Sequence, residues 1–89
     1  MKQQRNKLTK RTLIFDQVGI ALLAIQLKKA RISKDYTIRQ LAFESGVSRS
    51  QIDRIEAARI NPTVSTVFAI ARTLEIPLSE LFQFELPSK

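Results

Sequence analysis

The sequence predicts an all-α domain of about five helices, with two short helices joined by a tight turn near its centre. Apolar residues recur at helical spacing in successive segments, and hydroxyl residues stand where helices should begin. No segment alternates apolar and polar residues as a half-buried strand would. The chain has 89 residues, which is the size of a single domain.

The first helix is expected to run from Leu13 to about Ile32, a stretch that contains no proline. One apolar stripe along it ends at Arg31 and consists of Ile20, Leu23, Ala24 and Leu27. The helix carries a surplus of apolar residues off this stripe, namely Ile14, Val18, Leu22 and Ile25. Another surface must cover this surplus. The continuous apolar stretch within this helix is too short to cross a bilayer, so we expect no membrane partner.

The second helix is expected to begin after Thr37, because a threonine hydroxyl can accept a backbone N–H at a helix start. Gln40 follows three residues later and would complete a capping box. The body of this helix contains Leu41, Ala42 and Phe43. Gly46 should end it, since glycine adopts the left-handed conformation of a C-cap without strain.

The third helix should start after Ser48, with Ile52 and Ile55 facing inward. Together the second and third helices, TIRQLAFESGVSRSQIDRI, have the spacing of a helix-turn-helix. The residues expected to point inward are Leu41, Ala42, Val47, Ile52 and Ile55. An ordinary helical hairpin can also have glycine in its turn, so the outer face of the third helix must decide between the two.

The fourth helix should begin after Thr63, beyond the loop that ends in Asn61-Pro62. Its apolar residues keep helical spacing and are Val64, Val67, Phe68, Ala71 and Leu74. Pro77 permits one more short helix, from Leu78 to about Gln83, and its apolar anchors would be Leu81 and Phe82.

The outer face of the third helix is polar and comprises Arg49, Ser50, Asp53 and Arg54. Arginine can donate two hydrogen bonds to guanine, and serine can bond to any base. The N-terminal end of such a helix also presents backbone N–H groups to phosphates. A merely solvated charged face is the alternative, and Asp53 fits that alternative better than it fits DNA binding.

The net charge of +7 and the isoelectric point of about 10.4 indicate a polyanionic partner, nucleic acid before an anionic membrane surface. Solubility alone would explain this charge equally well. Much of it lies in residues 1–12, which we expect to form a flexible basic arm ahead of a helix-turn-helix domain over residues 13–89. This arm could follow phosphates or enter a minor groove, or it could remain unbound.

The residue types argue against an enzyme. The chain has no cysteine and no histidine, which removes disulfides, thiolate metal sites and the usual bases of nucleophilic catalysis. A glycine-rich phosphate loop is also missing. We therefore expect no enzymatic activity, no metal and no cofactor. The lack of cysteine is compatible with a cytoplasmic protein.

From Leu27 to Phe82 the chain resembles the lambda-repressor/Cro family of helix-turn-helix domains, also called the xenobiotic-response-element type. The matching pieces are Arg31, Tyr36-Thr37, LAFESGVSRSQIDRIE, Asn61-Pro62 and AIARTLEIPLSEL. The resemblance implies a lambda-repressor-like DNA-binding domain. It also implies that the protein is a small bacterial or phage transcription regulator, in the first instance a repressor, whose recognition helix enters the major groove of double-stranded DNA.

The resemblance also assigns roles to individual residues. Base edges would be read by Arg49, Ser50 and Arg54. The residues at or near phosphates would be Thr37, Ser48, Arg59 and Asn61, and such contacts fix register rather than sequence. Arg31 would pair with Glu56, which agrees with the high cost of burying a lone carboxylate directly after an inward-facing isoleucine.

Three residues depart from the family pattern. Ile38 stands where a glutamine is frequent, so the second helix should hold the DNA backbone less tightly. Asp35 and Ala58 stand where glycines are frequent, so both loops are expected to differ locally.

Such domains usually pair as homodimers on palindromic sites about one helical turn apart. Two surfaces are open for this: the first helix near Ile14, Val18 and Leu22, and the C-terminal end with Phe82, Phe84 and Leu86. Two other functions also stay open. The chain could be an antitoxin that binds a protein toxin and represses its own operon, or the controller of a restriction–modification operon.

Overall fold

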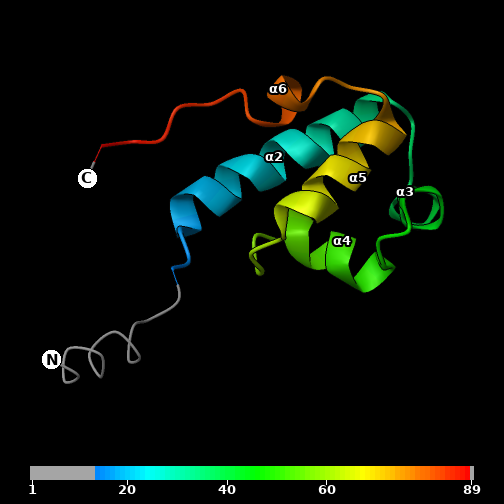
Figure 1. Ribbon diagram of the computed structural model, residues 1–89, viewed down its shortest axis with the longest axis horizontal. Helices are drawn as coiled ribbons and strands as arrows, with labels where there is room; N and C mark the ends of the chain where they lie inside the picture. The colour runs from blue at the N-terminus through cyan, green and yellow to red at the C-terminus, as the bar shows by residue number, and fades with distance from the viewer. Residues whose placement is uncertain (1–13, 89) are drawn as a thin grey trace, which may run out of the picture.

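The computed structural model describes residues 14–88, and helices are the only regular secondary structure among them. The helices are α2 (Gln17–Ser33), α3 (Ile38–Ser45), α4 (Arg49–Glu56), α5 (Val64–Leu74) and α6 (Leu78–Leu81), as Figure 1 shows. The expected all-α class is confirmed. The proposed basic arm, residues 1–12, lies outside the described residues.

The first helix begins later than we expected, at Gln17 rather than near Leu13. Asp16 is its N-cap, with an extended backbone and a side chain that accepts the backbone N–H of Gly19 at 2.9 Å. Ile14 and Phe15 therefore precede the helix. Its buried stripe consists of Leu23, Ala24, Leu27, Ala30 and Arg31. No helix between residues 14 and 88 is long and apolar enough to span a bilayer.

The expected helix starts at Thr37, Ser48 and Thr63 are confirmed. Each hydroxyl accepts the backbone N–H three residues ahead, at 3.0, 3.1 and 3.2 Å respectively. The predicted capping box is only half correct, because the hydrogen bond from the Gln40 side chain back to the helix start does not form. The Gln40 side chain donates to Glu44 at 3.4 Å, one turn further along α3, instead of turning back to the helix start.

Gly46 ends α3 with a φ of 81°, as the sequence predicted. Between residues 14 and 88, left-handed backbone also occurs at three other residues, none of them glycine: Asp35 at 60°, Ala58 at 58° and Glu75 at 55°. Asp35 and Ala58 are two of the three departures from the family pattern. At both positions the backbone adopts the conformation that a glycine favours, so a residue with a side chain is held there in a strained backbone conformation.

The core takes side chains from every helix. The large side chains that are completely buried are Leu27, Leu41, Ile52, Ile55, Ile70, Leu74 and Leu81. α2 packs on α4 and α6, and α3 packs on α4 and α5. Some expected core residues lie outside this cluster, because the buried stripe of α5 passes beside them and because α6 ends at Leu81, earlier than expected. They are Val64, Phe68 and Phe82, all of them exposed. Phe43, in the body of α3, is exposed as well.

Candidate nucleic-acid interface

The turn between α3 and α4 is short and closed by local hydrogen bonds. The N–H of Gly46 donates to the carbonyl of Ala42 at 3.0 Å, and that of Val47 donates to Oγ of Ser45 at 3.1 Å. Val47 is buried beneath the turn. In Figure 1, α4 lies at the lower edge of the helical part of the molecule.

The two sides of α4 differ sharply. Ile52 and Ile55 are buried, at 0% and 1% exposure. The side chains of Arg49, Ser50, Asp53 and Arg54 are all exposed. Gln51 is exposed as well, and the sequence reasoning passed over it, although glutamine is a side chain that can pair with adenine. The outer side of α4 therefore presents hydrogen-bond donors over most of its length.

Thr37 and Ser48 stand at the N-terminal ends of α3 and α4. Their hydroxyl oxygens are occupied as acceptors of backbone N–H groups. A hydroxyl that accepts in this way keeps its own hydrogen. Both residues are exposed, so each can donate that hydrogen to a phosphate oxygen without losing its helix cap.

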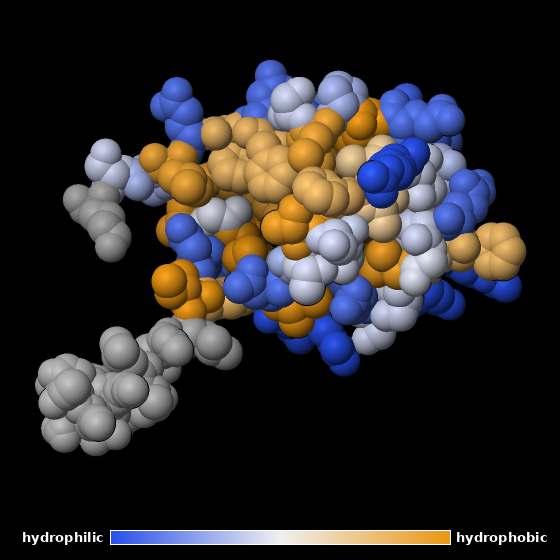
Figure 2. All heavy atoms as spheres, in the orientation of Figure 1, coloured by the Kyte–Doolittle hydropathy of each residue, from blue (hydrophilic) through white to orange (hydrophobic). Residues whose placement is uncertain are grey.

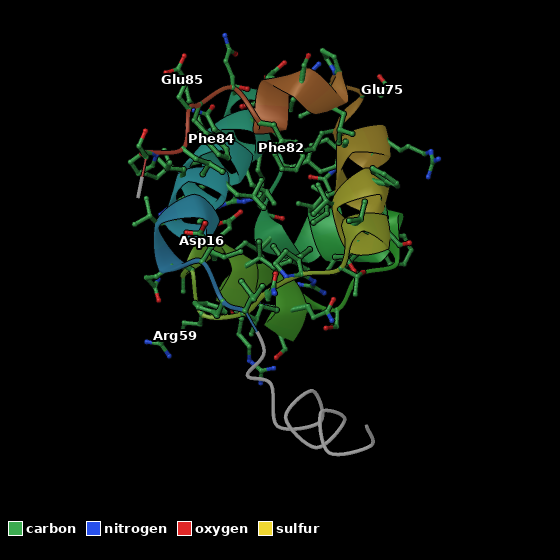
Figure 3. The ribbon with its side chains drawn as sticks, turned by 60° about the vertical axis from the view of Figure 1, so that its left-hand side comes forward. Asp16, Arg59, Glu75, Phe82, Phe84 and Glu85 are labelled. Atoms are coloured by element: carbon green, nitrogen blue, oxygen red, sulfur yellow. The ribbon has the colours of Figure 1, made fainter. Side chains whose placement is uncertain are left out.

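Arg59 and Asn61 lie in the loop that follows α4, but their side chains behave differently. Arg59 is exposed and points outward in Figure 3, while its backbone N–H donates to the carbonyl of Arg54 at 2.9 Å. The Asn61 amide nitrogen instead donates to the carbonyl of Ile14 at 3.4 Å. Gln17 crosses in the opposite direction, to the carbonyl of Ala58 at 3.3 Å. This loop is therefore held against the start of α2.

Arg31 and Glu56 form a bidentate ion pair. Nε of Arg31 donates to Oε2 of Glu56 at 2.7 Å, and Nη2 donates to Oε1 at 3.0 Å. Nη1 donates to the carbonyl of Tyr36 at 2.8 Å. The two side chains are only 10% and 6% exposed. The hydrogen bond to Glu56 raises the pKa of Arg31, against the opposing effect of burial. The last residue of α4 is thus tied to α2 by a charged contact.

A second polar contact fixes α3. The Tyr36 hydroxyl donates to Oε1 of Glu44 at 2.7 Å, and it also lies 3.4 Å from the carbonyl of Thr73 on α5. The hydrogen bond to Glu44 is the main cause that raises the pKa of Tyr36, followed by desolvation. From the sequence, Tyr36 is recognisable only as part of a family pattern, because its partners lie eight and 37 residues away.

A shallow hollow runs along α3 and the turn to the start of α4, and its lining includes Thr37, Ser48 and Arg49. Arg39 lines it too, a residue that the sequence reasoning did not single out. Arg39 is exposed on the first turn of α3. A phosphate bound near Thr37 could therefore contact Arg39 as well as Arg49. Among residues 14–88, no cluster of three or more acidic side chains is arranged to hold a metal ion.

Comparison with known proteins identifies relatives of the central region. Over 56 residues the chain is 46% identical to the HTH-type transcriptional regulator SlrR of Bacillus subtilis (strain 168), covering 62% of this chain and 37% of that protein. Over 57 residues it is 35% identical to the HTH-type transcriptional regulator SutR of Escherichia coli (strain K12), covering 64% and 32%. The chain thus spans about a third of the length of these relatives.

Solved structures of helix-turn-helix regulators are also similar to this chain. An HTH_3 family transcriptional regulator from Vibrio cholerae superposes with a TM-score of 0.72 and 31% identity, over 75% of this chain and 38% of that one. The restriction-modification controller protein C.AhdI from Aeromonas hydrophila gives 0.72 and 27%, over 74% of this chain and 96% of that one. The profile of the HTH_3 helix-turn-helix family matches residues 27–81. The chain therefore belongs to the HTH_3 family of DNA-binding transcription regulators and has the lambda-repressor-like fold that the sequence predicted.

Proposed function

We propose that this protein regulates transcription by binding a specific double-stranded DNA site with α4 in the major groove. It acts as a repressor in the bacterial cytoplasm, where an occupied site blocks transcription. The observation that carries this proposal is the contrast between the two sides of α4. Its buried isoleucines and the Arg31–Glu56 pair hold the helix rigidly, while its outer side offers exposed donors.

Arg49, Ser50 and Arg54 are the proposed base-reading residues. Arg49 and Ser50 form the first turn of α4, where a recognition helix approaches base edges most closely. Arg54 lies one turn after Ser50 on the same side. A bidentate arginine–guanine contact distinguishes its base by about 1–3 kcal/mol. Gln51 is an additional candidate at the edge of this group.

Thr37, Ser48, Arg59 and Asn61 are the proposed phosphate contacts. The hydroxyls of Thr37 and Ser48 keep a hydrogen to donate, and Arg59 is exposed. The Asn61 amide has a second hydrogen beyond the one it gives to Ile14. We add Arg39 to this set, since it can supply a phosphate hydrogen bond that Ile38, in place of a glutamine, cannot make. Such contacts set affinity and register for any sequence.

The test is selection of bound fragments from the host genome at physiological salt with excess competitor DNA. A two-fold-symmetric consensus site is the expected result, because paired recognition helices read palindromes. Arg49→Ala should weaken binding to that site far more than to unrelated DNA. Arg72→Ala is the matched control, since it removes the same charge from an exposed position on α5. Recovery of no site above background would contradict the proposal.

A second candidate function is control of a restriction–modification operon. The observation in its favour is the similarity to C.AhdI, of which 96% is covered by the superposition. Under this function the selected site should lie upstream of the protein's own gene, next to genes for a methyltransferase and an endonuclease. A site elsewhere in the genome would favour general repression instead.

A further inference from the structure

The side of α2 that faces away from the core carries a second row of mostly apolar residues. Successive members of this row follow one another at alternating steps of four and three residues. Because an α-helix has 3.6 residues per turn, such steps keep the side chains in line along one side of the helix. The row lies opposite the buried stripe that contains Leu23 and Leu27. We call it the outer stripe of α2, and its members are Val18, Leu22, Ile25, Lys29 and Ile32.

The fold leaves much of this outer stripe open to water. Val18, Ile25 and Ile32 are 50%, 60% and 55% exposed. In Figure 3, α2 forms the left flank of the molecule, and α4, α5 and α6 lie to its right. Figure 2 shows apolar side chains gathered over α2, α5 and the segment after α6. A helix that is apolar all round is typically buried all round, so the outer stripe lacks a partner surface.

The spacing of the outer stripe identifies the shape of that partner. Alternating steps of four and three are the spacing of positions a and d in a heptad, by which one α-helix packs along another. The stripe keeps this spacing over two full heptads of α2, from Val18 to Ile32, and Lys29 is its one charged member. A single polar residue in such a seam selects the partner and its register. The outer stripe therefore fits a second helix laid along α2.

The charges on this side of α2 restrict which helix can bind. Lys28 and Lys29 are both exposed. The only ion pair between residues 14 and 88 joins Arg31 to Glu56, so neither lysine has a carboxylate partner among them. A second copy would bring a net charge of +7, and residues 1–13 contain lysine and arginine but no acidic residue. A partner helix with carboxylates beside its apolar row complements this surface, whereas a basic one is repelled.

We propose that the outer stripe of α2 binds an amphipathic helix of a second protein, whose apolar residues recur at heptad spacing and whose flanking carboxylates contact Lys28 and Lys29. The opposite side of α2 packs on α4 and α6. A helix docked on the outer stripe therefore leaves the outer side of α4 uncovered. The partner can join the protein while α4 is on DNA. The inference goes beyond the proposed function and does not depend on how α4 reads DNA.

The probe is a synthetic helical peptide of about three heptads, with leucine at positions a and d and glutamate at the flanking positions. A second peptide has lysine in place of every glutamate. Fluorescence anisotropy of each labelled peptide, titrated with the full 89-residue chain, measures binding. The wild-type chain should bind the glutamate peptide with a Kd below about 1 mM. It should bind the lysine peptide at least about tenfold more weakly.

Three variants locate the binding surface. Ile25→Glu places a charge in the middle of the outer stripe and should weaken binding of the glutamate peptide at least about tenfold. Phe43→Glu is the matched control, because it makes the same change of charge at an apolar residue that is 85% exposed on α3, and it should bind as wild type does. Lys29→Glu should reduce the preference for the glutamate peptide by about tenfold. All three positions are exposed, so circular dichroism should show the wild-type fold.

The proposal would be overturned if the wild-type chain did not bind the glutamate peptide, or bound both peptides equally. Equal binding of the glutamate peptide by Ile25→Glu and Phe43→Glu would overturn it as well. If vesicles of phosphatidylglycerol bound the wild type but not Ile25→Glu, while the peptide bound neither, an anionic lipid surface would be the occupant instead. If light scattering showed a wild-type dimer that Ile25→Glu made monomeric, a second copy would occupy the stripe, against the proposal.

Discussion

Replacing Glu56 with alanine should destabilise this protein more than any exposed substitution. The change removes both hydrogen bonds that the Glu56 carboxylate accepts from Arg31, at 2.7 and 3.0 Å. The guanidinium would keep one hydrogen bond, to the carbonyl of Tyr36 at 2.8 Å. With its side chain 10% exposed, Arg31 could gain little compensating interaction from water.

Removing one partner of a buried ion pair costs about 3–5 kcal/mol, because the other charge is left without compensation. The pair stands close to the protein surface, so we expect the lower end, about 3 kcal/mol. Small domains have a total stability of about 5–15 kcal/mol, so this is a large share of it. In a domain of this size the melting temperature should fall by about 10–20 °C.

Thermal and urea unfolding followed by circular dichroism would measure the change in stability. Glu56→Gln keeps the shape and an acceptor but removes the charge, and should be less destabilising than Glu56→Ala. Glu85→Ala removes an exposed carboxylate and should stay within about 0.5 kcal/mol of wild type. If Glu56→Ala were no more destabilising than Glu85→Ala, the pair would not anchor α4 and this reasoning would be refuted.

Four further predictions concern the backbone, the single tyrosine and the arm. Ala58→Gly should raise the free energy of unfolding by up to about 1 kcal/mol, as relief of a left-handed residue exceeds the entropy cost of glycine; a decrease in urea unfolding would contradict this. Gly46→Ala should cost about 1–2 kcal/mol by the same measurement, from conformation alone, because nothing lies within 4 Å of the added methyl; a neutral result would contradict the turn geometry. Tyr36 is the one tyrosine and the chain has no tryptophan, so its ultraviolet absorbance should titrate with a pKa above 10.0, and Glu44→Ala should lower that pKa. The stability that this hydrogen bond adds is present below the unfolded pKa and is lost as the pH rises through the folded one; identical titrations of wild type and variant would exclude the bond. Deleting residues 1–12 should weaken binding to all DNA sequences and reduce the salt slope by about 0.9 for each phosphate that the arm neutralises, whereas an unchanged slope would exclude the arm from binding.

The sequence by itself determined where most helices begin and how α3 turns into α4. The residues that cap these helices contact backbone groups only a few positions away, so local sequence is enough to predict where the helices begin and end. They are Thr37, Ser48, Thr63 and Gly46. The buried stripes follow from helical periodicity for the same reason. The start of α2 also obeys a local rule, since Asp16 is a favoured N-cap, and the expected start near Leu13 neglected that rule.

Other features depend on which surfaces meet, and only the tertiary structure decided them. Two hydrogen bonds hold the start of α2 to the loop after α4. One joins residues that are 41 positions apart in the sequence, and the other joins residues that are 47 positions apart. The exposure of Phe82 depends on where α6 ends and how the segment after it crosses α2. Asp35 and Ala58 take left-handed backbone although neither is a glycine, a conformation that the residue itself does not favour. Local preference carries no information about such distant contacts.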